Sequence, residues 1–118
     1  MKPVKVSFIG DASEEWESLN KVVAEENSKG MENSEKQQLL KSIKQKIELI
    51  KINPQYGSSV PKKLMPKKFP VDNLWVVDLT GYWRMIYTLK GSQVEILCFI
   101  LEIIDHRKYD KLFGYRKK

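Results

Sequence analysis

The sequence predicts an α+β protein of two layers, in which a helical hairpin covers one face of an antiparallel sheet. Three observations lead to this fold class: an alternating apolar segment opens the chain, two long segments of helical period follow, and three segments rich in β-branched and aromatic residues end it. Turns of hairpin length separate the last three, so they are expected to pair as antiparallel neighbours. The predicted order is β-α-α-β-β-β within one domain, residues 1–118.

The N-terminal segment predicts a strand followed by a helix. In "PVKVSFIG" apolar and polar side chains alternate, which is typical of a half-buried strand and places one over residues 1–9. Asp11 with Glu14 three residues later is a capping pattern. Apolar residues at helical spacing follow, beginning with Trp16, so a helix is predicted over residues 13–29.

A second helix is predicted over residues 34–52. Ser34 and Gln37 form a capping box at its start, and isoleucines then recur at steps of three and four, so that one stripe faces a core while lysines face water. Asn53 and Pro54 end it, because proline cannot continue a helix. The short segment "SKGMENS" joins the two helices, which favours an antiparallel helical hairpin.

Three strands are predicted in the C-terminal half, over residues 73–80, 82–90 and 94–105. A connection rich in proline and lysine, residues 54–72, leads into them. The last strand is almost continuously apolar, which indicates an interior position in the sheet. A short tail or helix follows it.

The net charge of +6 is unevenly distributed. Residues 1–60 hold nine lysines and nine acidic residues, whereas residues 61–118 hold twelve cationic and six acidic residues. The whole excess therefore belongs to the second half, which suggests an anionic partner such as nucleic acid, a membrane surface or an acidic protein. The alternative is a solvated basic face that keeps the protein soluble.

Several classes of protein are excluded by the composition. No run of 18 apolar residues could form a transmembrane helix, and the first residues do not resemble a signal peptide, so a cytoplasmic protein without membrane contact is expected. One histidine and one cysteine cannot build a zinc site of the usual kind, and no glycine-rich phosphate loop is present. Cys98 lies within an apolar run, which predicts a buried, unreactive thiol.

Arg84 is the most informative single residue, because it stands within an apolar and aromatic strand. With a period of two, one face of this strand carries Tyr82, Arg84, Ile86 and Thr88, and the other, predicted to pack under the helices, carries Trp83, Met85, Tyr87 and Leu89. The first face is therefore expected to expose Arg84. It could offer a guanidinium fork to phosphate, or it could form a structural ion pair with Asp78 on the adjoining strand.

His106 is predicted to end the last strand, beside the strand that carries Arg84. Histidine can exchange a proton near neutral pH, which lysine and arginine ordinarily cannot do. Nearby aromatic residues, namely Tyr109, Phe113 and Tyr115, could stack on bases or could dock a C-terminal helix on the sheet. We therefore predict that "DHRKY" forms one wall of an anion-binding cleft and that "GYRKK" is the tail beyond it.

Four features combine into a recognisable pattern: the order of elements, "NPQYG" after the second helix, "LWVVDLTGYWRMIYTL", and a last strand ending in "IIDHRKY". Together they resemble the RelE/ParE superfamily of toxins from type II toxin–antitoxin systems. The resemblance spans nearly the whole chain. It is most specific at Leu74-Trp75, at Arg84-Met85-Ile86-Tyr87 and at His106-Arg107-Lys108.

The resemblance implies an endoribonuclease that cleaves mRNA in the ribosomal A site, contacts ribosomal RNA, needs no cofactor or metal, and is held inactive by a cognate antitoxin. Such enzymes use the RNA's own 2′-hydroxyl as nucleophile and leave a 2′,3′-cyclic phosphate. By position, Arg84 matches the strand arginine that stabilises charge on the phosphorane, and His106 and Arg107 match catalytic positions. The implied RNA-binding residues are Lys62, Lys63, Lys67, Lys68, Lys108 and Tyr109.

The chain departs from the family pattern at two positions. Lys111 stands where many members have a tyrosine, and Asp72 stands where some have a glutamate base. The general base is therefore either His106 or a lysine. The ParE branch shares the fold but inhibits DNA gyrase without cleaving RNA, so an inhibitor of gyrase and an inactive binding module remain the alternative functions.

Overall fold

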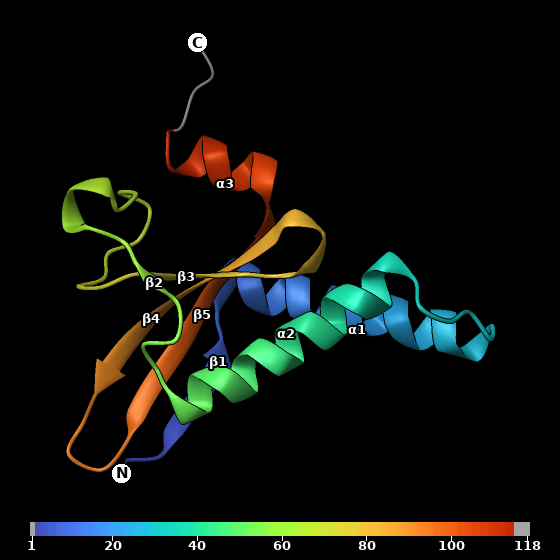
Figure 1. Ribbon diagram of the computed structural model, residues 1–118, viewed down its shortest axis with the longest axis horizontal. Coiled ribbons are helices and arrows are strands. Elements are labelled where there is room, and N and C mark those ends of the chain that lie inside the picture. The colour runs from blue at the N-terminus through green and yellow to red at the C-terminus, as the bar shows by residue number, and fades with distance from the viewer. Residues whose placement is uncertain (1, 115–118) are drawn as a thin grey trace.

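The computed structural model describes residues 2–114 and confirms the α+β class (Figure 1). The strands are β1 (Val4–Phe8), β2 (Ser58–Ser59), β3 (Trp75–Asp78), β4 (Trp83–Gly91) and β5 (Ile96–Asp105). The helices are α1 (Gly10–Ser28), α2 (Glu35–Ile52) and α3 (His106–Leu112), with short 3-10 turns at Lys62–Leu64 and Thr80–Tyr82. The sheet has the strand order β1-β5-β4-β3-β2, so β5 is interior as predicted. No helix within residues 2–114 is long and apolar enough to cross a membrane.

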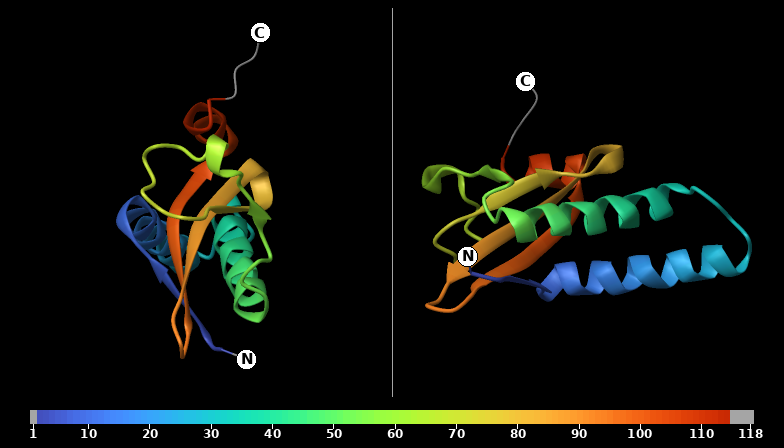
Figure 2. Two further views of the ribbon diagram at one scale, coloured as in Figure 1. Left: turned by 90° about the vertical axis from the view of Figure 1, so that its left-hand side faces the viewer. Right: turned by 60° about the horizontal axis from the view of Figure 1, so that its bottom comes forward.

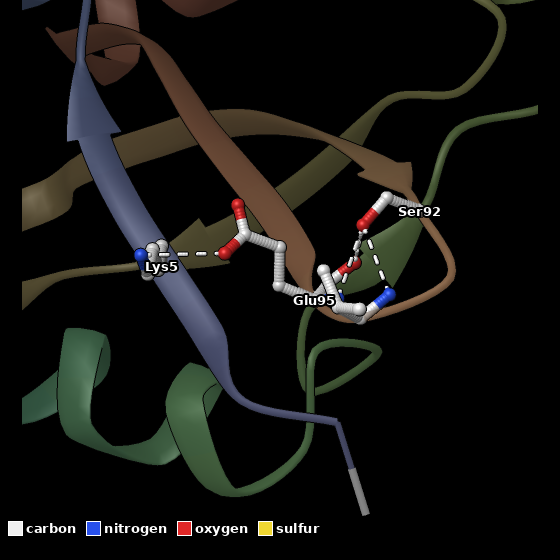
Figure 3. Close-up of polar contacts among 4 residues, drawn as sticks. Lys5, Ser92 and Glu95 are labelled. Atoms are coloured by element: carbon white, nitrogen blue, oxygen red, sulfur yellow. Dashed lines mark hydrogen bonds and ion pairs between the residues drawn. The ribbon is translucent and has the colours of Figure 1, made fainter.

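The prediction of a wholly antiparallel sheet is wrong at one edge, because β1 pairs with β5 in parallel, from Val4 opposite Ile96 to Phe8 opposite Ile100. The helical hairpin carries the chain away from β1, so no tight turn forces β1 to run against its neighbour. Figure 3 shows how the start of the pair is held: Lys5 forms an ion pair with Glu95 at 3.3 Å. The Ser92 hydroxyl accepts a hydrogen bond from the Glu95 amide at 3.0 Å and so closes the β4–β5 turn.

The two long helices begin differently. Helix α2 begins with the predicted capping box, in which the Ser34 hydroxyl accepts a hydrogen bond from the Gln37 amide at 3.1 Å and the Gln37 side chain accepts one from the Ser34 amide at 3.3 Å. The prediction that Asp11 and Glu14 cap α1 is wrong. Helix α1 begins at Gly10, and Asp11 lies in its first turn without capping it.

The main core lies between the helical hairpin and one face of the sheet, and Figure 2 shows α1 and α2 side by side along that face. Its largest fully buried members on β4 and β5 are Met85, Tyr87, Cys98 and Ile100. Trp83 and Leu89 pack against it from the rim. The face of β4 that the sequence assigned to the core is therefore confirmed.

A second, smaller core on the opposite face was not predicted. Its buried members are Phe69, Leu74, Val76, Ile86 and Ile104. Side chains of the segment of residues 60–71 and of helix α3 pack against them. Ile86 and Thr88, which share the face of Arg84, are consequently buried instead of exposed. On this side Arg84 is partly exposed at one end of β4, and Lys90 is exposed at the other end.

Cys98 is fully buried, and this burial raises the pKa of its thiol to about 12. The folded protein thus holds the thiol proton more tightly than the unfolded chain does. This difference contributes to the free energy of unfolding in full below about pH 9, and the contribution is lost as the pH rises toward 12. We expect iodoacetamide to alkylate Cys98 in denaturant at pH 8 but not in the native protein, as measured by mass spectrometry. Fast labelling of the native protein would contradict the buried site.

The segment before β2 is fixed by a buried tyrosine. The Tyr87 hydroxyl donates a hydrogen bond to the Pro54 carbonyl at 2.8 Å and accepts one from the Gly57 amide at 3.0 Å. A Cβ atom on Gly57 would lie 2.8 Å from the Val76 carbonyl oxygen and 3.0 Å from the Tyr87 hydroxyl. A side chain therefore cannot fit there without moving the backbone.

We expect Gly57→Ala to lower the free energy of unfolding by about 1–3 kcal/mol, because it forces Pro54–Gly57 away from Tyr87. Urea unfolding measures this change. Gly91→Ala is the matched control, since a Cβ there meets no atom within 4 Å. Equal stability of both variants would show that Gly57 does not need its close approach to β3.

Candidate functional site

Arg84 lies on β4, opposite Asp78 on β3 and Ile104 on β5. Its Nε lies 3.2 Å from Asp78 Oδ1, so the ion pair that the sequence left open is present. The Asp78 side chain is 83% exposed, which makes this pair a weak one. The guanidinium also lies over the Tyr109 ring, with Cζ 4.5 Å from the ring centre. Tyr109 itself packs against Phe113, with 4.5 Å between the ring centres, so the guanidinium lies against an aromatic pair.

His106 does not end a strand as predicted; it is the first residue of α3. The reason is a local cap: Asp105 Oδ1 accepts a hydrogen bond from the Lys108 amide at 2.9 Å, which starts a helix directly after β5. The His106 side chain is exposed. Its ring meets that of Tyr82 edge to face, with 5.7 Å between the ring centres.

Two contacts bring Arg84 and His106, two of the three predicted catalytic residues, into one surface group. Tyr82 is the last residue of the turn before β4 and lies two residues before Arg84, whereas His106 and Tyr109 are three apart on α3 and so share one side of that helix. Tyr82 packs on His106, and Arg84 packs on Tyr109. We call these four residues the β4–α3 cluster. It lies where α3 passes over the end of the sheet near the β3–β4 turn (Figures 1 and 2).

Sequence reasoning missed one member of this cluster. Tyr82 was placed on the face of Arg84 by its period of two, but nothing in that pattern showed that it would contact His106. The contact depends on α3 turning back over β4, which the strand pattern alone does not reveal. The remaining candidates of this region, Arg107 and Lys108, are exposed on α3. Lys108 lies on a different side of α3 from Tyr109.

Lys108 lines a hollow of about 610 Å³ between α1, β5 and α3. Lys68 and Lys111 contribute further cations to it, and four acidic residues face them: Asp11, Glu14, Glu15 and Glu102. The mixed charge makes this hollow a poor site for a polyanion.

Lys68 is already paired within the fold. Its ammonium lies 2.6 Å from Glu102 and 3.4 Å from Asp11. The hydrogen bond to Glu102 is the main cause that raises the pKa of Lys68. Because Glu102 is buried, it needs this partner, and the contact ties the segment of residues 60–71 to β5 and α1. Lys68 was predicted to bind RNA, but its contacts are those of a structural residue.

Three other predicted lysines remain exposed on the same segment: Lys62, Lys63 and Lys67. Lys62 and Lys63 belong to the 3-10 turn, and none of the three forms an ion pair with another residue of the described range 2–114. They are available to a polyanion. Within that range no three histidine, cysteine or carboxylate side chains are grouped to hold a metal ion. Tyr115 and the "GYRKK" tail after Gly114 lie outside the described residues.

Of the comparisons with known proteins, the one with solved structures bears on the fold. No family model and no curated protein sequence matches the chain. Among solved structures, a YoeB/ParE toxin from Agrobacterium tumefaciens is similar, with a TM-score of 0.55 and 16% sequence identity over 90% of this chain and 99% of that one. The fold expected from the resemblance to the RelE/ParE superfamily is thus confirmed.

Proposed function

We propose that this protein is the toxin of a type II toxin–antitoxin system and that it cleaves mRNA on the ribosome. The observation that supports this best is the β4–α3 cluster, in which a partly exposed arginine and an exposed histidine are joined through Tyr82 and Tyr109. An anion-binding group beside a proton-exchanging group is what RNA cleavage requires. The fold shared with a YoeB/ParE toxin supports the same class of function.

In the proposed reaction the 2′-oxygen attacks the adjacent phosphorus and forms a 2′,3′-cyclic phosphate, while the bond from phosphorus to the 5′-oxygen breaks. Arg84 binds the non-bridging oxygens, where negative charge increases in the transition state. The 5′-oxygen leaves with a proton from His106. Water or a neutral lysine accepts the proton of the 2′-hydroxyl. Arg107, one residue after His106, supplies a further positive charge at this end of α3.

The partners follow from the same proposal. The exposed lysines at 62, 63 and 67 contact the phosphates of mRNA in the A site and of ribosomal RNA. Such contacts release counterions, so binding weakens steeply with salt. A cognate antitoxin silences the protein by covering this cationic surface.

A gyrase inhibitor is the second candidate, and one observation favours it. The ion pair of Arg84 with Asp78 and its stacking on Tyr109 give this arginine a structural role that needs no substrate. In that case the cluster would only help to dock α3 on the sheet.

Primer extension on translating ribosomes separates the two candidates. We expect extension stops at new 5′ ends of the mRNA with the wild type and far fewer with Arg84→Ala or His106→Ala. Lys90→Ala is the control, because Lys90 is exposed near the β4–β5 turn, at the other end of β4 from the cluster. An absence of cleavage by the wild type together with inhibited supercoiling by gyrase would assign the protein to the ParE-like branch.

A further inference from the structure

Tyr82 lies at the tip of the β3–β4 hairpin in an unusual backbone conformation. Its φ is +63°, and that of the preceding Gly81 is +66°. The Trp83 amide donates a hydrogen bond to the Thr80 carbonyl, so both central residues of this turn have positive φ, as in a type I′ turn. Glycine and asparagine are the preferred residues at such positions, because a bulky side chain is hindered there.

The side chain of Tyr82 makes few contacts that could offset this unfavourable backbone conformation. It is 79% exposed, and its ring meets His106 only edge to face. An unfavourable backbone conformation that burial does not offset is found most often at functional sites. The turn thus holds an aromatic ring in water, next to the predicted catalytic histidine and two residues before Arg84.

We propose that Tyr82 is the platform on which one base of single-stranded RNA stacks, beside the phosphate that Arg84 binds. This inference rests on the proposed function and specifies how the substrate is held. Tyr82 directly precedes β4 and Arg84 is the second residue of that strand, so their Cα atoms lie no more than about 7 Å apart, which suits a base and the phosphate of an adjacent nucleotide. Every base offers a π-face, so the platform accepts single-stranded RNA of any sequence. A stacked base also positions the 5′-oxygen against His106.

The test uses a short 2′-O-methyl oligoribonucleotide, which binds but cannot react because its 2′-oxygens are blocked. A matched series carries one abasic nucleotide at successive positions. Binding of the full-length protein is measured by fluorescence anisotropy, and thermal stability by differential scanning fluorimetry. The variants are Tyr82→Asn, which removes the ring and suits positive φ, and Tyr82→Phe, which keeps the ring. Tyr56→Asn is the control, since Tyr56 is a partly exposed tyrosine without positive φ.

We expect Tyr82→Asn to melt at a higher temperature than the wild type and to bind the intact oligonucleotide about 5- to 150-fold more weakly, the range for stacking of a single base. One abasic position should weaken binding by the wild type and Tyr82→Phe but not by Tyr82→Asn. Tyr56→Asn should show neither gain in stability nor loss of affinity.

Two results would overturn the platform: unchanged affinity of Tyr82→Asn for the intact oligonucleotide, or no measurable binding by the wild type. A third result would contradict only the proposal that the protein is a nuclease. If the wild type discriminates against the abasic position through Tyr82 but cleaves nothing on ribosomes, the platform stands and the nuclease proposal falls.

Discussion

Replacing Arg84 by alanine is expected to slow cleavage of ribosome-bound mRNA by about a hundred- to a thousandfold, the cost of losing one donor to charge that develops in the transition state. The guanidinium lies over the Tyr109 ring, and its ion pair with Asp78 through Nε is weak because Asp78 is exposed, so the positive charge of Arg84 stays available to a phosphate. Single-turnover cleavage at saturating protein measures the chemical step. Arg84→Lys should recover only a small part of the rate, since an ammonium cannot reproduce the planar fork.

Asp78→Asn distinguishes the catalytic role of Arg84 from a structural one. It removes the carboxylate of the ion pair and leaves the guanidinium on Tyr109. If Arg84 binds the phosphate, Asp78→Asn should cleave at close to the wild-type rate while Arg84→Ala does not. If both variants lose activity equally and both melt at lower temperature, the ion pair matters for the fold and the proposed role of Arg84 is wrong.

Local patterns were sufficient to predict the elements near Arg84. The period of two on β4 assigned Met85 and Tyr87 to the main core and Arg84 to the other side, and the structure agrees. The pattern gave no information on strand direction, so the parallel pairing of β1 with β5 could not be predicted from it. A capping pattern is equally local, and at Asp11 the helix had already begun one residue earlier.

The parts of the site that were missed depend on contacts between distant segments or on local backbone geometry that a hydrophobic pattern does not reveal. Lys68 looked like any other cation of a basic connection, because only the folded chain brings the buried Glu102 to it. The position of His106 depends on the Asp105 cap, which turns a strand into a helix within one residue. Tyr82 carried a possible signal, since it follows glycine at a hairpin turn, but the positive φ that makes it unusual is a property of the backbone and not of composition.

Replacing His106 by alanine is expected to slow cleavage by about a hundredfold or more, because the leaving 5′-oxygen would depart without a proton. The variant should fold normally, since His106 is exposed and its ring contact with Tyr82 is made at the surface. Thermal melting checks this. A rate loss with an unchanged melting temperature would separate chemistry from stability.

An mRNA with a sulfur atom in place of the 5′-bridging oxygen tests the assigned proton transfer directly. A thiolate leaves without protonation, so His106→Ala should cleave this substrate nearly as fast as the wild type does. Arg84→Ala should remain slow on it, because charge still develops on the non-bridging oxygens whichever atom leaves. If His106→Ala stays equally slow on the sulfur substrate, His106 does not protonate the leaving group. Its remaining role in the reaction is then to accept the proton of the 2′-hydroxyl.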